Sequence, residues 1–208
     1  MNWMKKVAVA LVCLLPLGLQ AAKVDTLQVK SPSMNKSIEV VVVSPDVAAT
    51  KACPVIYLLH GYGGNARTWV GIKPDLPKIA DEKGIFFVCP DGKNTWYWDS
   101  PLNADVRYET FISDELVKYV DSHYKTVADR KGRAITGLSM GGHGAMWNGL
   151  RHSDVFSAAG STSGGVDIRP FPKNWEMSVQ IGEKAKYPEN WEKYTVINLV
   201  PTLRKDQI

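Results

Sequence analysis

The stretch ITGLSMGGHGA, residues 135–145, decides the fold. It carries the pattern G-x-S-x-G centred on Ser139, and it stands between a predicted strand, residues 133–136, and a predicted helix, residues 141–150. In that context the pattern indicates a sharp strand-to-helix turn that lifts a nucleophilic serine clear of a sheet. Glycine is needed on both sides because the backbones close around the serine and leave no room for side chains. The alternative is a glycine-rich turn with an idle serine.

A second glycine-rich loop, LLHGYGG at residues 58–64, follows another strand that is predicted to be buried. Backbone N–H groups of such a loop, together with the N–H of Met140 at the start of the helix, can form an oxyanion hole. A phosphate-binding loop is the alternative. The spacing of its glycines, however, matches neither the P-loop nor the G-x-G-x-x-G pattern.

Predicted strands and helices alternate around these two loops. Strands are predicted at residues 24–29, 37–44, 54–59, 85–88, 133–136 and 155–161, and helices at residues 75–83, 111–124, 141–150 and 191–203. This alternation predicts an α/β fold with a mostly parallel sheet and helices on both faces. Residues 166–192 break the rhythm, and we expect an excursion with short helices there.

Residues 1–22 have the pattern of a secretory signal peptide. A basic start precedes an apolar run at residues 7–19, and small residues at positions 21–22 offer a cleavage site. The run of about 13 residues is short for a bilayer, which argues against the alternative of an uncleaved membrane anchor. We therefore expect residues 23–208 to form an exported domain, secreted or periplasmic, without stable membrane insertion.

The composition is that of one globular domain. The chain has 208 residues, of which 45% are apolar, 22% charged and 10% aromatic, and these fractions exclude fibrous and disordered classes. Without Lys5 and Lys6, 23 of the 25 basic residues remain against 21 acidic ones, so nucleic acid is not an expected partner. Cys53 and Cys89 fall at opposite ends of two predicted parallel strands, which predicts two buried free thiols.

Taken with PDG at residues 90–92 and WYWDSP at residues 96–101, the two loops resemble the Putative esterase family of the α/β-hydrolase fold. This family includes esterase D, tributyrin esterase, feruloyl esterases and the mycobacterial mycolyltransferases. The likeness runs from about residue 24 to the end, and the motifs occur in the order of the family. It implies a serine esterase whose substrate is a small-molecule or carbohydrate-linked ester, with no cofactor and no metal.

The resemblance also implies roles for individual residues. Ser139 is implied to be the nucleophile, and the backbone N–H groups of Tyr62 and Met140 are implied to form the oxyanion hole. The aromatic residues implied to line the acyl or leaving-group pocket are Trp96, Tyr97 and Trp98. For these three, packing beneath a loop is the alternative.

A general base is not evident in the sequence. In this fold the histidine follows the serine and the acid, whereas the last of the four histidines is His152, at the end of the predicted helix. His60 is committed to the end of its strand, and His123 is expected at an exposed helix end. His143 is expected to be packed or to cap the helix. We therefore expect the triad acid and histidine to lie after Ile208, in a domain whose last strands are missing.

Three hypotheses follow for the function. The first is an exported carboxylic-ester hydrolase that works through an acyl-enzyme on Ser139, with acyl transfer to another acceptor left open. The second is a catalytically inactive, hydrolase-like domain that binds an ester or a glycan. The third, a serine peptidase of related fold, is expected to need an additional gating domain. Export argues against hydrolysis of S-formylglutathione, which is a cytosolic reaction.

Overall fold

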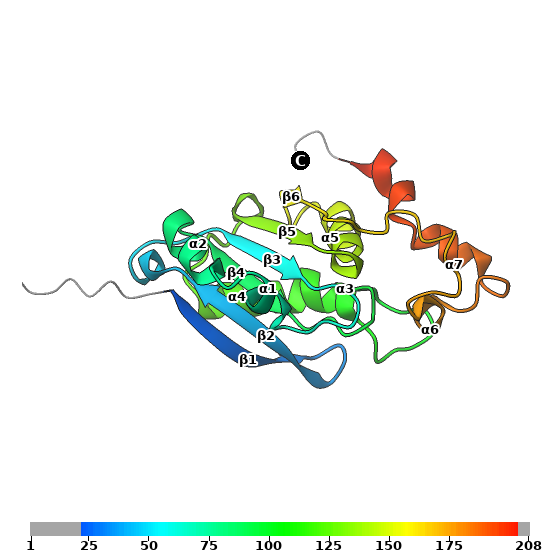
Figure 1. The fold of residues 1–208 in the computed structure, drawn as a ribbon, viewed down its shortest axis with the longest axis horizontal. Coiled ribbons are helices and arrows are strands. Elements are labelled where there is room, and N and C mark those ends of the chain that lie inside the picture. Colours follow the sequence, from blue (N-terminus) through cyan, green and yellow to red (C-terminus); the bar gives the residue numbers. More distant parts are fainter. Residues whose placement is uncertain (1–21, 204–208) are drawn as a thin grey trace, which may run out of the picture.

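The strands form a mixed sheet in a computed structural model that describes residues 22–203 (Figure 1). The six strands are β1 (Lys23–Ser31), β2 (Lys36–Ser44), β3 (Val55–Leu59), β4 (Phe86–Pro90), β5 (Arg133–Gly137) and β6 (Ala158–Ala159), in the order β1-β2-β4-β3-β5-β6. The hairpin β1–β2 is antiparallel and joins β4 in antiparallel fashion, while β4, β3, β5 and β6 are parallel. The carboxyl ends of the parallel strands therefore share one edge of the sheet.

Helices cover both faces of this sheet. They are α1 (Thr68–Ile72), α2 (Leu76–Lys83), α3 (Tyr108–Thr110), α4 (Leu116–His123), α5 (Met140–Arg151), α6 (Met177–Ile181) and α7 (Pro188–Lys193), with a π-helical turn at Phe111–Glu115 and 3-10 turns at Asp46–Ala49, Arg130–Gly132 and Val196–Thr202. Side chains of α4 and α5 pack against one face, and side chains of α2 pack against the other. None of the helices within residues 22–203 is long and apolar enough to cross a membrane.

The run of valines in β2 shows why the strands are apolar on both sides. Val40 and Val42 point into the core formed with α4 and α5, whereas Val41 and Val43 point into the core formed with α2. Successive side chains of a strand face opposite sides, so a strand between two helical layers has no polar face. The predicted α/β layering is confirmed.

Three elements differ from their predicted form. The helix predicted at residues 111–124 begins at Tyr108 and contains the π-helical turn. The strand predicted at residues 155–161 shrinks to β6, although Ser157, Gly160 and Thr162 still donate N–H bonds to β5. The helix predicted at residues 191–203 is divided into α7 and the 3-10 turn Val196–Thr202, because the backbone is extended at Thr195 between them.

The excursion at residues 166–192 lies where the parallel strands end. It contains α6, α7's start and irregular backbone, as predicted. In Figure 1, α6 and α7 lie beyond the end of the sheet toward which β3 points. The excursion is thus placed at the edge that carries the Ser139 turn. The predicted signal peptide, residues 1–22, lies outside the described residues except for Ala22.

Candidate active site

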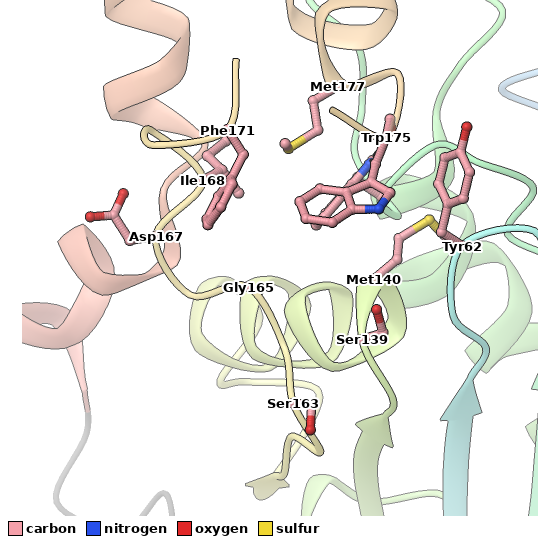
Figure 2. Close-up of a pocket in the computed structure, with 11 residues that line it drawn as sticks. Tyr62, Ser139, Met140, Ser163, Gly165, Asp167, Ile168, Phe171, Trp175 and Met177 are labelled. Atoms are coloured by element: carbon pink, nitrogen blue, oxygen red, sulfur yellow. Dashed lines mark hydrogen bonds between the residues drawn. The ribbon is translucent and has the colours of Figure 1, made fainter. Parts of the chain in front are cut away.

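Ser139 occupies a strained turn between β5 and α5. Its backbone has φ 52° and ψ −118°. Residues other than glycine adopt a positive φ of this kind only when the surrounding structure enforces it. The residue is exposed, and its hydroxyl points up into a cavity, as Figure 2 shows. A strained serine at a strand-to-helix turn is the arrangement that presents a nucleophile to a substrate.

The two flanking glycines are required by close backbone contacts. A Cβ on Gly137 would lie 2.7 Å from the carbonyl oxygen of Leu59, and it would also meet the backbone of Gly141. A Cβ on Gly141 would lie 2.5 Å from the carbonyl oxygen of His60. The predicted steric role of both glycines is confirmed, because β5, α5 and the end of β3 meet with no room for a methyl group.

Backbone hydrogen bonds hold the turn in place. The N–H of Ser139 donates to the carbonyl of Thr162 over 2.9 Å, and the carbonyl of Ser139 accepts from the N–H of His143 over 3.0 Å. The N–H of Leu138 donates to the carbonyl of Leu59 over 3.3 Å. The strain at Ser139 is therefore balanced by bonds to both neighbouring segments.

The proposed oxyanion donors border the same cavity. Tyr62 and Met140 both line it, and among residues 22–203 neither backbone N–H has a hydrogen-bond partner. Met140 is the first residue of α5, whose opening N–H groups have no acceptor within the helix. The loop that carries Tyr62 is held by the residue after it. The backbone N–H of Gly63 donates to Asn94 Oδ1 over 2.9 Å, and Gly63 has a positive φ of 75°.

The cavity has a volume of about 300 Å³ and a mostly apolar wall. Its lining residues are Tyr62, Trp96, Ser139, Met140, Ser163, Gly165, Asp167, Ile168, Phe171, Trp175 and Met177. Figure 2 shows Trp175 above Ser139, Phe171 to the left of Trp175 and Met177 at the top, and the ring centres of Phe171 and Trp175 lie 5.5 Å apart. The excursion thus supplies a wall of this cavity, which the sequence did not assign to it.

The aromatic triplet divides between the cavity and the core. Trp96 lines the cavity, and its indole N–H donates to the carbonyl of Trp175 over 3.1 Å. The expectation that Tyr97 and Trp98 line the pocket is wrong, since both are fully buried and neither borders this cavity. Tyr97 donates its hydroxyl proton to the carbonyl of His60, and Trp98 donates its indole proton to His143 Nε2.

His143, four positions after the serine, is a packed core residue. Its Nε2 accepts from Trp98 Nε1 over 2.9 Å, which leaves the proton on Nδ1 to donate to the carbonyl of Gly165 over 2.6 Å. Burial lowers the pKa of His143 to about 4, and the ring is neutral at pH 7. With both ring nitrogens engaged, His143 cannot take a proton from Ser139.

The other histidines are also engaged or distant. The N–H of Gly92 donates to His60 Nε2 over 2.9 Å, and His60 Nδ1 bonds the carbonyl of Gly61. His123 is exposed at the end of α4, stacked on Tyr119, and α4 ends near the opposite edge of the sheet. Among the described residues, no histidine has a free ring nitrogen facing Ser139.

His152 and Asp167 are also not placed to act on Ser139. His152 bonds the Glu109 carboxylate over 2.8 Å at the far end of α5. Asp167 borders the cavity, but its two carboxylate oxygens each accept from Arg169 over 2.8 Å. That pairing lowers the pKa of Asp167, and in Figure 2 the carboxylate points away from Ser139. The described residues therefore place an exposed serine beside two backbone N–H groups without partners, and none of their histidines is placed to act as its base.

Known proteins share both the sequence pattern and the fold. The family described as Putative esterase matches residues 31–207. Esterase Rv1288 of Mycobacterium tuberculosis is 30% identical over 149 residues, which are 68% of this chain and 32% of that protein. The chain thus spans about a third of the length of that curated relative.

Solved structures extend the likeness to the fold. A ferulic acid esterase matches with a TM-score of 0.68 and 29% identity, over 90% of this chain and 74% of that one. FphF, a fluorophosphonate-binding serine hydrolase of Staphylococcus aureus, matches with a TM-score of 0.73 and 18% identity, over 88% of this chain and 73% of that one. The predicted α/β-hydrolase fold is confirmed.

Proposed function

Because the chain belongs to the Putative esterase family, we propose that it acts as a serine carboxylic-ester hydrolase with Ser139 as nucleophile. The observation that carries the proposal is the exposed serine in a left-handed turn, open to an apolar cavity. The ferulic acid esterase and Rv1288, both named as esterases, support it. Strain of this kind persists where the surrounding structure enforces it for function.

The proposed reaction is acyl transfer in two steps. Ser139 Oγ attacks the ester carbonyl carbon while a base takes its proton, and the carbonyl electron pair moves onto oxygen. The N–H groups of Tyr62 and Met140 stabilise that oxyanion, and loss of one such donor typically costs about 3 kcal/mol. Collapse of the intermediate releases the alcohol with the proton and leaves an acyl-serine. Water, deprotonated by the same base, then releases the acid and regenerates Ser139.

The base in this proposal comes from outside residues 22–203. The four histidines of the chain all lie within that range, and none faces Ser139 with a free nitrogen. The chain order of the fold places the acid and the histidine after the serine. We therefore assign both roles to residues that follow Ile208 in the reading frame.

The cavity supports an apolar or aromatic acyl group as the preferred substrate. Its aromatic side chains are Tyr62, Trp96, Phe171 and Trp175, and no lysine or arginine lines it. Aromatic walls of this size suit a single ring or a short apolar chain. The ferulic acid esterase among the similar structures is consistent with this substrate class. Export, inferred from residues 1–22, places the ester outside the cytoplasm, either secreted or periplasmic.

A second candidate function is binding without catalysis. It is favoured by one observation: His143, the histidine nearest to Ser139 in sequence, is locked between Trp98 and Gly165. A domain with a cavity and a serine but no base would bind an ester or a glycan without cleaving it.

The reading frame beyond Ile208 and its product separate the two candidates. A histidine that follows an acidic residue, and hydrolysis of p-nitrophenyl acetate that falls at least about 10³-fold in Ser139→Ala, would support the hydrolase. The 208-residue chain itself should hydrolyse this ester no faster than its Ser139→Ala variant. A stop codon directly after Ile208, with no serine-dependent hydrolysis, would support the binding domain. A serine-dependent burst from the 208-residue chain would contradict our assignment of the base.

A further inference from the structure

Ala22, which directly precedes β1, is bound into the fold. Only 9% of its surface is exposed, and it packs in the core on the α2 side of the sheet, in the cluster that also holds Val43 and Ala80. Its backbone N–H donates to Asp81 Oδ2 over 2.7 Å. The fold thus has a defined place for Ala22, at the end of the segment in which cleavage of the signal peptide is predicted.

Asp81 joins three segments through its carboxylate. The residue lies on α2, and its Oδ1 accepts from the backbone N–H of Asp46 over 2.8 Å, two residues after β2 ends. Its Oδ2 accepts from Ala22, just before β1 begins. Both donors are backbone groups, and within residues 22–203 no lysine, arginine or histidine forms an ion pair with this carboxylate. Asp81 is therefore well bonded but has no counter-charge among the described side chains.

The charges around Ala22 favour a positive group at its nitrogen. The pKa of Asp46 is raised, first by desolvation and then by the nearby Asp81 carboxylate, so two acids lie close together beside this nitrogen. A cation that contacts Asp81 reduces the repulsion between them. The lysines of the adjoining strand and helix are directed elsewhere: Lys23 pairs with Asp25 over 3.0 Å, Lys78 pairs with Glu82 over 3.6 Å, and Lys83 is exposed.

We propose that a signal peptidase hydrolyses the peptide bond between Ala21 and Ala22, and that the α-ammonium group so formed binds the Asp81 carboxylate. Water adds across the bond, so that Ala21 ends the released peptide with a carboxylate and Ala22 begins the domain with a free amine. The sequence does not choose between the bonds after Ala21 and after Ala22, because a small residue precedes both. Cleavage after Ala22 would remove a core residue and its bond to Asp81.

The domain would then begin one residue earlier than the predicted boundary at residue 23. Cleavage comes before folding in this scheme, since folding buries Ala22. An uncleaved chain offers Asp81 a neutral amide N–H, whereas the ammonium offers a charge-assisted bond that is about twice as strong. Processing should therefore stabilise the folded protein where β1, α2 and the turn after β2 meet. This inference rests on the export proposed above and is independent of catalysis by Ser139.

The first residue of the exported protein tests the site of cleavage. The full reading frame is expressed with its own signal peptide, and the amino-terminal peptide of the exported protein is identified by mass spectrometry after its free amine is labelled. We expect Ala22 as the first residue. Lys23 or any other first residue would overturn our inference but leave export intact. Retention of residues 1–21 would contradict both the inference and export, and neither result bears on hydrolysis by Ser139.

Thermal unfolding at two pH values tests the ion pair. The processed protein is compared with one produced without export, in which Met and Lys precede Ala22 and its nitrogen is an amide. At pH 7 the processed protein should melt about 2–4 °C higher, because its ammonium adds a charge-assisted bond to Asp81. At pH 10 the difference should vanish, since the ion pair contributes while the amine is protonated and is lost as pH rises through the pKa of the amine.

Two substitutions, each made in both proteins, locate the amine. Asp81→Asn keeps an acceptor for Ala22 but removes the charge, so the difference at pH 7 should fall below about 1 °C. The control Glu82→Gln, one position later and exposed on α2, should preserve the difference. Equal melting temperatures of the two parent proteins at pH 7, or a difference that survives Asp81→Asn, would overturn the proposed ion pair.

Discussion

Gly141 is the residue where a single methyl group should cost the fold most directly. Its added Cβ would press on the carbonyl oxygens of Leu59 and His60, and backbone atoms at the end of β3 cannot rotate away. We expect Gly141→Ala to lower the free energy of unfolding by about 2–3 kcal/mol, in line with overpacking at a tight site. Urea unfolding followed by circular dichroism measures the change.

Gly71 provides the matched control for this substitution. It is exposed in α1, and nothing lies within 4 Å of its added Cβ. Gly71→Ala should stabilise the protein by about 0.5–1 kcal/mol, because alanine loses less backbone entropy in a helix. Equal effects of the two substitutions would contradict the close approach of β3, β5 and α5.

His143 should make stability depend on pH in a defined window. Its pKa is lowered from 6.5 to about 4 by burial, so between these values the unfolded chain binds a proton that the folded chain does not. The free energy of unfolding should therefore fall as pH drops from about 6.5 to about 4, by up to about 3 kcal/mol from this group. Urea titrations at pH 7.5, 5.5 and 4.5 measure it.

Substitution of His143 separates this contribution from those of other groups. His143→Gln retains an acceptor for Trp98 but cannot be protonated, so the fall in stability between pH 6.5 and 4 should become shallower. His123→Gln, at the exposed end of α4, leaves His143 in place and should keep the parent's slope. If His143→Gln also kept that slope, the buried neutral ring would not be its source.

The positions of some side chains could be predicted from the sequence alone, and those of others could not. The G-x-S-x-G pattern alone predicts that Gly137 and Gly141 have no room for a side chain, and this is confirmed, although the atoms that crowd them include the end of β3. Tyr97 and Trp98 could not be placed that way, because consecutive positive φ values at Trp96 and Tyr97 decide which ring faces the cavity. Those values are set by tertiary contacts, and the sequence carries no local sign of them.

At the scale of elements, Glu109 should act as the tie between α3 and the end of α5. Its buried carboxylate accepts from Trp147 Nε1 over 2.8 Å and from Arg151 Nε over 2.7 Å, and it also bonds His152. We expect Glu109→Ala to lower the free energy of unfolding by about 2–4 kcal/mol, since a buried indole N–H and two basic groups lose their acceptor. Thermal and urea unfolding would report the loss.

Asp114→Ala is the control for Glu109→Ala, because it also removes one carboxylate from this helical segment but at an exposed position. Asp114 pairs with Lys118 on the exposed side of the same helical segment, four positions apart. Exposed pairs of this kind contribute little, so Asp114→Ala should change stability by no more than about 0.5 kcal/mol. A comparable loss in both variants would mean that helix propensity, and not the buried tie, dominates.

Elements differ in how well local patterns foretell them. β3 and β4 were predictable because an apolar run bounded by Pro and Gly belongs to a strand buried on both sides. The π-helical turn at Phe111–Glu115 was not, since it depends on how the segment fits the sheet and not on residue periodicity. β6 is the last strand of the described sheet and pairs with β5 over only two residues, which the apolar pattern of residues 155–161 does not indicate.

At the scale of the whole molecule, the alternation of strands and helices was enough to predict the layers and the edge that holds the Ser139 turn. Contacts between segments that are distant in the sequence could not be predicted from this alternation. The aromatic cavity joins the loop after β3, the turn after β5 and the excursion, which are brought together only by the folded sheet. The excursion's part in the cavity wall therefore had to come from the structure.

Both described cysteines are buried in the core, so their reactivity depends on the stability of the whole fold. Cys53 and Cys89 are free and each is 1% exposed, which confirms the predicted buried thiols. Val55 of β3 pairs with Phe86 of the parallel β4, so the two cysteines lie about five strand positions apart. That separation, about 16 Å, is far beyond the reach of a disulfide.

Alkylation of these thiols should therefore require global unfolding. Burial raises the pKa of both Cys53 and Cys89, and reagent has no access to either in the folded state. Iodoacetamide at pH 8 should leave both peptides unmodified in mass spectra of native protein and should modify both in 6 M guanidinium. In low urea the two should be labelled at the same rate, because Cys89 lies in β4 and Cys53 lies two residues before the neighbouring β3, and we expect these segments to open together. Rapid labelling of Cys53 alone in native protein would show that the β3 end opens locally, and it would contradict a single cooperative core.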